Sequence, residues 1–324
     1  MSTHTECHDS PIKSIYYLIA GVIVFSLQDV IIKWISSKYP VNEIVLIRSC
    51  FAIIPILFIA YLEGGVHLLR TNHYVGHVIR SFFMFGAYIC FYLSLAALPL
   101  AETVSLFFSA PILITILSAT FLGEKVEIRS WIAVLVGFLG VIIMMRPGYR
   151  MIDPAVLLAL LTAFLYAIAS IITRRLGKTE TGVSMAFYLA VTYIIFSAIF
   201  TLALNNIVVT QKTHPSFTFL FREWRLPSQG DLFLFMIIGL ISAAGFYFLS
   251  QAYRLAQPST IAPFEYIAVP LSVIWGYLFF KDILEFQSVI GMILIVGSGL
   301  YIFGSKKGLT NKYVLSIFKI KIRR

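Results

Sequence analysis

The chain has 324 residues, of which 59% are hydrophobic and only 12% are charged. A soluble protein carries about 25% charged residues, so this chain has too few polar side chains to cover a water-facing surface. The composition therefore argues against a soluble enzyme, a disordered chain and a disulfide-stapled secreted module. Because lipid requires every backbone polar group to be bonded internally, the apolar stretches should be helices, and we predict an all-α membrane protein.

The formal net charge is +10, an excess of cations that in a soluble protein would indicate nucleic acid as a partner. Here the cations lie in short loops and in one tail, which is typical of a membrane protein that faces anionic lipid. We therefore expect contact with membrane lipid and none with nucleic acid. The three cysteines show neither CxxC pairs nor metal-type spacing, and no cofactor-binding motif occurs, so we predict no metal and no cofactor.

Ten apolar stretches are long enough to cross a membrane, which takes roughly 20 residues per helix. In chain order they cover residues 12–33, 44–62, 77–97, 101–121, 130–145, 154–172, 184–204, 231–252, 259–280 and 286–303. The first stretch contains Asp29 and lacks a small-residue cleavage site, so we expect a retained span and not a signal peptide. Most separators are short, and the exception is a polar insertion at about 205–230.

The ten stretches divide into two related halves. Lys33 aligns with Arg174 at an offset of 141 residues, and Pro111 aligns with Pro270 at an offset of 159; the polar insertion accounts for the difference. Each half holds five spans, and because five is odd, the second copy should enter the membrane in the opposite direction. Inverted repeats of this kind are typical of secondary transporters. We predict repeats over 12–145 and 154–303, followed by a basic tail over 304–324.

The basic tail also decides the predicted orientation. With both termini on the cytoplasmic side, the tail makes the inner side the more positive, as the positive-inside rule requires. Without the tail the two sides carry nearly equal numbers of cations. The tail contains no acidic residue, which suits attraction to a lipid surface. Its cations are Lys306, Lys307, Lys312, Lys319, Lys321, Arg323 and Arg324.

Ionisable side chains inside a span cost about 2.5–3.5 kcal/mol at the helix centre, so they usually face the protein interior or a cavity. Asp29 lies in the first span with Gln28 beside it, and Arg48 lies about one turn into the second span. Both should lie toward the outer side of the membrane. They either form an ion pair that joins the two spans or line an outer gate that contacts substrate. Lys33 follows one turn after Asp29 and is expected to extend to the lipid interface.

Glu265 lies about 10 Å into the ninth span, at 1.5 Å per residue. Pro263 and Pro270 flank it, and each removes a backbone N–H, so the helix should break in this region. The corresponding position of Pro270 in the first half is Pro111. Broken helices line the transport sites of many transporters near the middle of the membrane. We predict a cavity role for Glu265, with the alternative that a neighbouring Arg or Tyr only satisfies its carboxylate.

Aromatic residues make up 15% of the chain, and several lie on the related spans 4, 8 and 9. Among them Phe107 and Tyr266 are candidates to contact a flat, ring-containing substrate, although most aromatic residues of membrane proteins belong to the core or to the interface belts. Gly137 and Gly140 on the fifth span suit close helix packing, either within one subunit or between two subunits of a homodimer.

Short motifs in both halves point to one family. They are Gln28-Asp29-Val30-Ile31-Ile32-Lys33-Trp34, Tyr39-Pro40-Val41, Ile47-Arg48-Ser49, Ser109-Ala110-Pro111, Leu122-Gly123-Glu124 and Ala262-Pro263-Phe264-Glu265-Tyr266. As a set they resemble EamA-type members of the drug/metabolite transporter superfamily, over about residues 12–304. The resemblance implies ten helices in two inverted EamA repeats, a central cavity built mainly from spans 1–4 and 6–9, and a location in the inner membrane.

Within that superfamily the chain resembles bacterial members that take up riboflavin or S-adenosylmethionine. We therefore expect a secondary transporter, not an enzyme, that moves a small organic metabolite by alternating access. The aromatic-rich spans favour riboflavin or a similar ring-containing metabolite as the first candidate. Uptake of S-adenosylmethionine and efflux of amino acids or drugs are the alternatives. A proton is the expected coupling ion, since the sequence contains no sodium-type ligand set.

Overall fold

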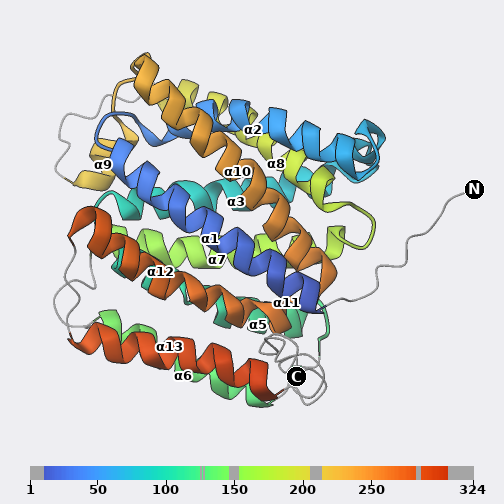
Figure 1. The fold of residues 1–324 in the computed structure, drawn as a ribbon, viewed down its shortest axis with the longest axis vertical. Helices are drawn as coiled ribbons and strands as arrows, with labels where there is room; N and C mark the ends of the chain where they lie inside the picture. The colour runs from blue at the N-terminus through green and yellow to red at the C-terminus, as the bar shows by residue number, and fades with distance from the viewer. Residues whose placement is uncertain are drawn as a thin grey trace, which may run out of the picture.

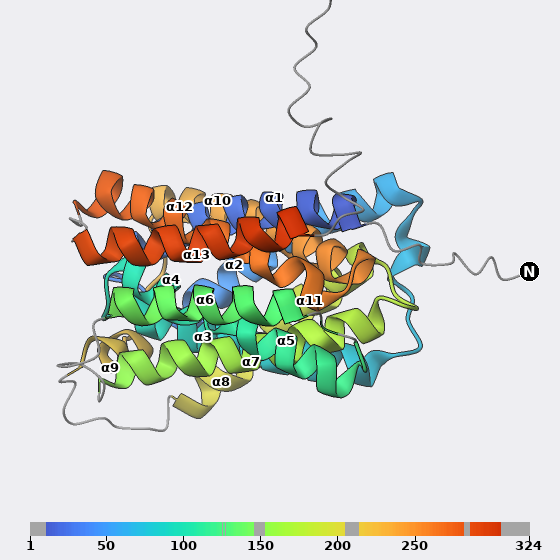
Figure 2. The ribbon, with the colours of Figure 1, turned by 90° about the horizontal axis from the view of Figure 1, so that it is seen from below.

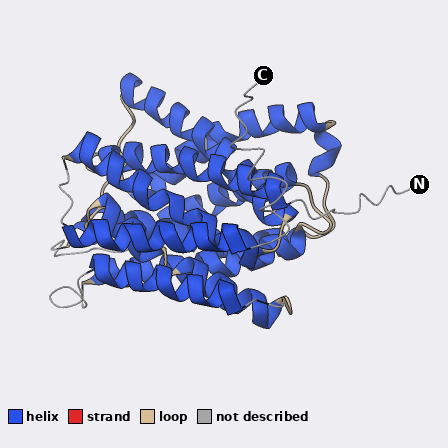
Figure 3. Ribbon diagram, turned by 60° about the horizontal axis from the view of Figure 1, so that its bottom comes forward, coloured by secondary structure: helices blue, strands red, loops and turns tan. Residues whose placement is uncertain are grey.

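The computed structural model describes residues 11–124, 126, 128–145, 153–204, 214–281 and 286–305. Within these ranges the chain forms helices and loops without any strand (Figure 3). Eight helical segments of the described residues are long and apolar enough to cross a membrane. They are Ile12–Ile35, Val41–Glu63, Tyr74–Leu95, Leu100–Phe121, Pro154–Leu176, Gly182–Leu204, Gln229–Leu255 and Pro258–Phe280. The prediction of an all-helical, multi-pass membrane protein is thus confirmed.

The helices follow one another with short connections. In chain order they are α1 (Pro11–Ile35), α2 (Val41–Glu63), α3 (Tyr74–Leu95), α4 (Leu100–Phe107), α5 (Ala110–Phe121), α6 (Ile128–Met145), α7 (Pro154–Leu176), α8 (Gly182–Leu204), α9 (Pro215–Leu220), α10 (Gln229–Leu255), α11 (Pro258–Ile261), α12 (Ala268–Trp275) and α13 (Phe286–Ser305). Three further helical segments are η1 (Val66–Leu69), η2 (Ala262–Ile267) and η3 (Gly276–Phe280). The basic tail beyond residue 305 lies outside the described residues.

The long helices lie side by side in one bundle (Figures 1 and 2). The main packing pairs are α1 with α10, α2 with α8, α3 with α7, and α6 with α13. Each pair joins a helix from the first half of the chain to one from the second half, so the two halves are interleaved. The α6–α13 pair lies at one edge of the bundle (Figure 1). Helix α1 begins, and helix α13 ends, at the same end of the bundle, which we call the termini end.

Large apolar side chains cover much of the outer surface of the bundle. Phe82 is 60% exposed and Leu240 is 59% exposed, although each belongs to a membrane-length helix. In water this exposure would be unfavourable, whereas lipid acyl chains solvate such side chains at no cost. Tyr193, Phe235 and Phe246 instead lie in the core between the helices. The outward-facing apolar surface is therefore that of a protein solvated by lipid.

Two of the membrane-length segments are interrupted near their prolines. In the first half, α4 ends at Phe107 and α5 begins at Ala110, with Pro111 in the first turn of α5. In the second half, the 3₁₀ segment η2 contains Pro263, and α12 then begins at Ala268 with Pro270 in its first turn. The first N–H groups of a helix have no intrahelical partner, so a proline costs least there. The interruptions bring both broken spans beside the bundle centre.

The insertion at about 205–230 contains an element that its polar composition did not predict. Helix α9 packs against α3 and α2. The Ser216 hydroxyl donates to the Leu93 carbonyl at 2.6 Å, and Phe219 is 1% exposed. Residues 205–213 lie outside the described residues. The insertion thus covers one end of the bundle with a short helix. A helix of this length is stable only because it packs against the rest of the protein.

Candidate substrate cavity

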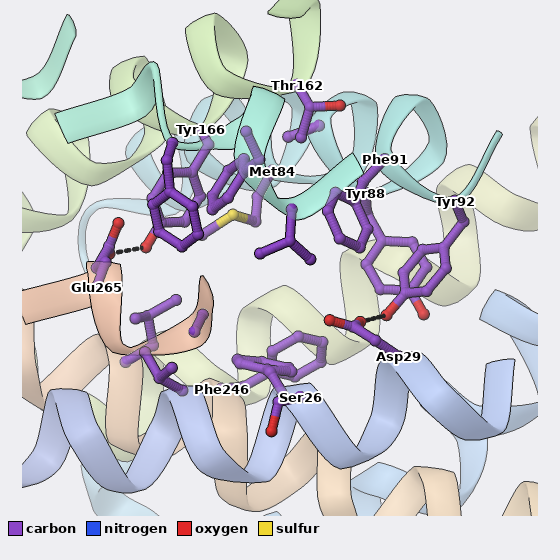
Figure 4. A pocket seen from close by; sticks show the side chains of 18 of the residues that line it. Ser26, Asp29, Met84, Tyr88, Phe91, Tyr92, Thr162, Tyr166, Phe246 and Glu265 are labelled. Atoms are coloured by element: carbon purple, nitrogen blue, oxygen red, sulfur yellow. Dashed lines mark hydrogen bonds between the residues drawn. The ribbon is translucent and has the colours of Figure 1, made fainter. Parts of the chain in front are cut away.

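A cavity of about 170 Å³ lies inside the bundle. Its walls come from α1, α3, α4, α7, α8, α10, η2 and α12, so both halves of the chain contribute. Most lining side chains are apolar or aromatic, and carboxylates lie at two opposite ends, Asp29 from α1 and Glu265 from η2 (Figure 4). Helix α2, which the resemblance included among the cavity spans, does not line the cavity.

The Asp29 end of the cavity is built from a chain of hydrogen bonds. The Tyr92 hydroxyl donates to Asp29 Oδ1 at 2.5 Å, as Figure 4 shows. Behind it, Gln28 Nε2 donates to the Tyr92 hydroxyl oxygen at 3.0 Å. Gln28 is itself buried and does not line the cavity. Tyr92 therefore holds Asp29 in place while the second carboxylate oxygen is left for another donor.

Arg48 ends this chain of bonds in the core of the bundle. Its side chain is 0% exposed, and its Nη1 donates to Ser242 Oγ at 2.6 Å and to Gln28 Oε1 at 3.3 Å. The guanidinium carbon lies 3.9 Å from the centre of the Tyr88 ring, which lines the cavity, whereas Arg48 itself does not line it. Cation–π contact of this kind is worth about 2 kcal/mol when desolvated. Arg48 therefore supports the cavity wall from behind.

Asp29 and Arg48 do not form a direct ion pair. No nitrogen of Arg48 lies within 4.0 Å of an Asp29 oxygen in the described residues, and the two are joined through Gln28 and Tyr92. The sequence offered an ion pair or a gate as alternatives, and the structure shows a relay of neutral side chains in place of the pair. This arrangement leaves the Asp29 carboxylate open to the cavity.

At the Glu265 end of the cavity the carboxylate is bonded by phenols, and no Lys, Arg or His nitrogen of the described residues lies within 4.0 Å of it. The hydroxyls of Tyr166 and Tyr253 both donate to Glu265 Oε1, at 2.5 and 2.6 Å. The second oxygen, Oε2, is buried and has no hydrogen-bond partner in the described residues. Tyr166 comes from α7 and Tyr253 from α10, so three elements meet at this carboxylate.

Arg80 is a cavity residue that the sequence analysis did not select. It lies in the second turn of α3, is 1% exposed and lines the cavity. Its Nε, Nη1 and Nη2 donate to Thr173 Oγ1 at 2.7 Å, to the Met185 carbonyl at 3.0 Å and to Ser250 Oγ at 2.9 Å. The signal that could have identified Arg80 is its position inside the predicted third span, residues 77–97, where a charged side chain is costly unless it faces the protein interior.

The two aromatic candidates differ in position. Phe107 lines the cavity, with its ring 5.1 Å from that of Tyr166 and 5.9 Å from that of Phe91. Tyr266 is buried but does not line the cavity. Its ring packs against Phe108 at 5.3 Å, and its hydroxyl lies so close to Gly137 that an added Cβ would come within 2.9 Å. Tyr266 therefore serves the packing of α6 against the bundle.

An aromatic cavity with buried charged groups, inside a bundle of membrane-length helices, is the arrangement of a small-molecule transporter. The profile of the EamA-like transporter family matches residues 12–146 and 153–304. The chain therefore belongs to the EamA-like transporter family, as its motifs indicated. Members of this family are transporters and not enzymes.

Curated relatives and a solved structure extend this result. An S-adenosylmethionine uptake transporter of Rickettsia prowazekii is 25% identical over 93% of this chain and 96% of its own length. A riboflavin transporter of Rhizobium johnstonii is 28% identical over 90% of both chains. A crystal structure with 18% sequence identity superposes with a TM-score of 0.69 and covers 90% of this chain and 98% of the other. That likeness shows a shared fold.

Proposed function

We propose that this protein takes up S-adenosylmethionine across the inner membrane by alternating access. The observation that carries the proposal is the pair of carboxylates, Asp29 and Glu265, at opposite ends of an aromatic cavity. S-adenosylmethionine has a flat adenine ring, a cationic sulfonium and an ammonium group, whereas riboflavin bears no cation. The carboxylates therefore rank S-adenosylmethionine ahead of riboflavin, the reverse of the order that aromatic content alone favours. The relatives named as S-adenosylmethionine uptake transporters support this ranking.

Each part of such a substrate has a complementary group in the cavity. Asp29 Oδ2 is left to accept from the ammonium group, and aromatic faces suit both the adenine ring and the sulfonium. Arg80 donates one hydrogen bond from each of its three nitrogens, and a guanidinium carries five N–H donors. Further N–H groups of Arg80 are therefore placed to bind the substrate carboxylate.

Riboflavin is the second candidate, on a separate observation. Phe91, Phe107 and Phe246 line the cavity together with the phenols of Tyr88 and Tyr92. Rings of this kind stack on an isoalloxazine, and hydroxyl groups bond a neutral polar edge. The relative named as a riboflavin transporter supports this choice.

Alternating access requires two halves that can rock against each other, and we propose two inverted five-helix repeats, ten spans in all, over residues 12–145 and 154–303. The packing pairs support this symmetry. Helix α1 packs on α10, the third long helix of its half, and α3, the third of the first half, packs on α7, the first of the second half. The second helices, α2 and α8, pack together, as do the last ones, α6 and α13. Such an exchange is what a two-fold axis between repeats produces.

The orientation is part of the same proposal. We place the termini end of the bundle in the cytoplasm because the basic tail follows α13 there, and cations accumulate on the cytoplasmic side. At this end Arg80 of the first half is bonded to Thr173, Met185 and Ser250 of the second half. These bonds must break for the cavity to open inward.

A flux assay with purified protein in proteoliposomes tests the proposed function. The probes are radiolabelled S-adenosylmethionine, riboflavin and a panel of amino acids, and S-adenosylhomocysteine serves as a competitor that lacks the sulfonium charge. We expect saturable uptake of S-adenosylmethionine, with much weaker competition by S-adenosylhomocysteine. Uptake of riboflavin alone would select the second candidate. Flux of amino acids without either metabolite would support the efflux alternative and contradict both.

A further inference from the structure

Glu265 lies in the membrane-spanning part of the protein without a cation beside it. Its side chain is 3% exposed, and no Lys, Arg or His nitrogen of the described residues lies within 4.0 Å of its carboxylate. An ionised carboxylate in apolar surroundings costs several kcal/mol unless it is paired. A bound proton removes that charge. The position therefore needs either a proton or a cation during part of the transport cycle.

The geometry at Glu265 leaves room for one proton. Both phenol hydroxyls reach Oε1, whereas Oε2 is buried and has no partner in the described residues. Because Tyr166 and Tyr253 both bond to one oxygen, the other carboxylate oxygen is left to carry the proton. The site thus resembles a proton-binding group that is fixed by neutral donors and not neutralised by a counter-ion.

The ionisable groups that face Glu265 come from few elements. Tyr166 of α7 and Tyr253 of α10 bind it directly, while Arg80 of α3 and Asp29 of α1 share the same cavity. Helices α5, α11 and α12, which pack against η2, carry no ionisable side chain, and α13, which also packs there, carries only Tyr301, which is 49% exposed. The three hydrogen bonds of Arg80 go to Thr173, Met185 and Ser250. In the described part of the chain, no Lys, Arg or His nitrogen thus lies within 4.0 Å of Glu265 to take the place of a proton.

The two carboxylates lie apart, and this separation determines whether a proton and the substrate can bind at the same time. Asp29, the site proposed for the cationic substrate, lies at the end of the cavity opposite Glu265 (Figure 4). A proton on Glu265 and a cation on Asp29 can therefore be present at the same time, whereas one shared carboxylate would force an exchange.

We infer that Glu265 carries one proton in each cycle and that this proton moves in the same direction as the substrate. This inference rests on the proposed uptake function. The proton binds the carboxylate from the outer side, and it leaves to the inner aqueous phase after the two halves rock. One proton and one substrate molecule cross together, and no covalent bond of the substrate changes. The substrate class is a cationic, ring-containing metabolite that occupies Asp29.

The wild-type protein provides the first test. Proteoliposomes are loaded at pH 8 with the fluorescent pH probe pyranine and diluted to pH 7, with valinomycin and equal potassium to hold the membrane potential at zero. We expect radiolabelled S-adenosylmethionine to accumulate about tenfold, the ratio that one proton supplies per pH unit, or 1.36 kcal/mol. We also expect its addition to acidify the interior when no gradient is imposed. This measurement does not depend on a variant that folds.

A variant then assigns the proton to one residue. Glu265→Gln keeps the shape and the acceptor oxygen for the two phenols but cannot exchange a proton. We expect it to lose the tenfold accumulation and the interior acidification while it retains exchange of internal for external substrate without a gradient. Glu180→Gln is the matched control, because Glu180 is buried in the connection between α7 and α8 and lies outside the cavity. It should accumulate substrate as the wild type does.

The outcomes separate the two proposals. Saturable uptake that ignores the pH gradient and leaves the interior pH unchanged would overturn the proton inference and keep the proposed function. Full gradient-driven accumulation by Glu265→Gln would also overturn it. Alkalinisation of the interior on substrate addition would show exchange and contradict co-transport. If the wild type moves neither S-adenosylmethionine nor riboflavin, the proposed function fails, and the inference fails with it.

Discussion

The two ends of the cavity each present a carboxylate, but they are built in different ways. Asp29 is held by Tyr92 and, through Gln28, is connected to the buried guanidinium of Arg48. Glu265 is held by two phenols and has no cation beside it. The guanidinium of Arg48 is therefore three hydrogen bonds away from the Asp29 carboxylate, whereas no chain of hydrogen bonds in the described residues joins Glu265 to a cation.

This difference separates two tasks that a transporter must combine. A carboxylate with a fixed, partly compensated charge is suited to bind a cationic group of the substrate. A buried carboxylate among neutral donors is suited to gain and lose a proton. The same residue type thus serves different chemistry because its neighbours differ.

The largest expected effect is at the Asp29 end. Asp29→Asn removes a charge-assisted contact worth about 1.5–3 kcal/mol, so uptake of S-adenosylmethionine at low concentration should fall roughly 10- to 100-fold. Riboflavin uptake, if present, should change little because that substrate bears no cation. The assay compares kcat/KM for both substrates in proteoliposomes. Asp153→Asn, at the N-cap of α7, is the matched control, since Asn is an equally good cap. Equal losses of kcat/KM for both substrates would show that Asp29 does not bind the cationic group of the substrate and would contradict the proposed difference between the two ends.

A smaller effect is expected from Arg48→Lys. Lysine keeps the positive charge but lacks the planar fork and the stacking surface, so Tyr88 and Gln28 should lose their fixed positions. We expect KM for S-adenosylmethionine to rise about tenfold with a smaller change in kcat. Steady-state uptake kinetics give this split. Arg175→Lys serves as the control because Arg175 is exposed and donates only to the Phe121 carbonyl. Unchanged KM in Arg48→Lys would show that the relay does not position Asp29.

The next effect concerns the phenols at the Glu265 end. Tyr166→Phe and Tyr253→Phe each remove one hydrogen bond worth about 1 kcal/mol, so each should slow gradient-driven uptake about fivefold. Exchange without a gradient should stay near the wild-type rate. Tyr266→Phe is an apt control, because the buried Tyr266 hydroxyl has no hydrogen-bond partner in the described residues. A similar loss in Tyr266→Phe would mean that the phenols act through general packing and not on Glu265.

The smallest effect concerns a buried carboxylate outside the cavity. Burial alone would raise the pKa of Glu180, but the attraction of His77, whose Nε2 lies 3.4 Å from Oε2, and hydrogen bonds from Thr71 and Ser184 outweigh burial and hold this pKa below its ordinary 4.5. A lowered pKa means that the group stabilises the fold above pH 4.5 and that this contribution is lost as the pH falls below that value. The melting temperature of Glu180→Gln should therefore lie about 2 °C below that of the wild type at pH 7.

The pH series completes this prediction. The difference between the two proteins should shrink as the pH falls from 5 to 3, measured by thermal unfolding in detergent. A difference that grows toward low pH would contradict the assigned direction. Transport by Glu180→Gln should remain normal at pH 7, in contrast to transport by Glu265→Gln. This result would show that burial of a carboxylate is not by itself sufficient to make a proton site.

Several features of the site could be predicted from the sequence because lipid does not solvate charged or unpaired polar groups. Charged side chains are excluded from it, so Asp29, Arg48 and Glu265 had to face the protein interior. The prolines at 111 and 270 marked the interrupted spans because a proline lacks the N–H that a continuous helix needs. The family also followed from short motifs over nearly the whole chain.

Other features of the site could not be predicted from the sequence because they depend on which residues are neighbours in space. Glu265 and Tyr266 are adjacent in sequence, but successive residues of a 3₁₀ segment point about 120° apart, so only one of them lines the cavity. Tyr166 lies 99 residues before Glu265, and no local pattern connects the two. Arg80 lay inside an apolar stretch, yet its three partners come from α7, α8 and α10.

By itself, the sequence determined that the protein lies in lipid, that its apolar stretches form membrane-spanning helices, and which charged residues must avoid lipid. Each of these properties depends on composition and on local backbone chemistry. Only the tertiary structure decided which carboxylate lies beside a guanidinium and which lies among phenols. That assignment depends on helices that are distant in the chain and adjacent in space, and it separates the proposed substrate site from the proposed proton site.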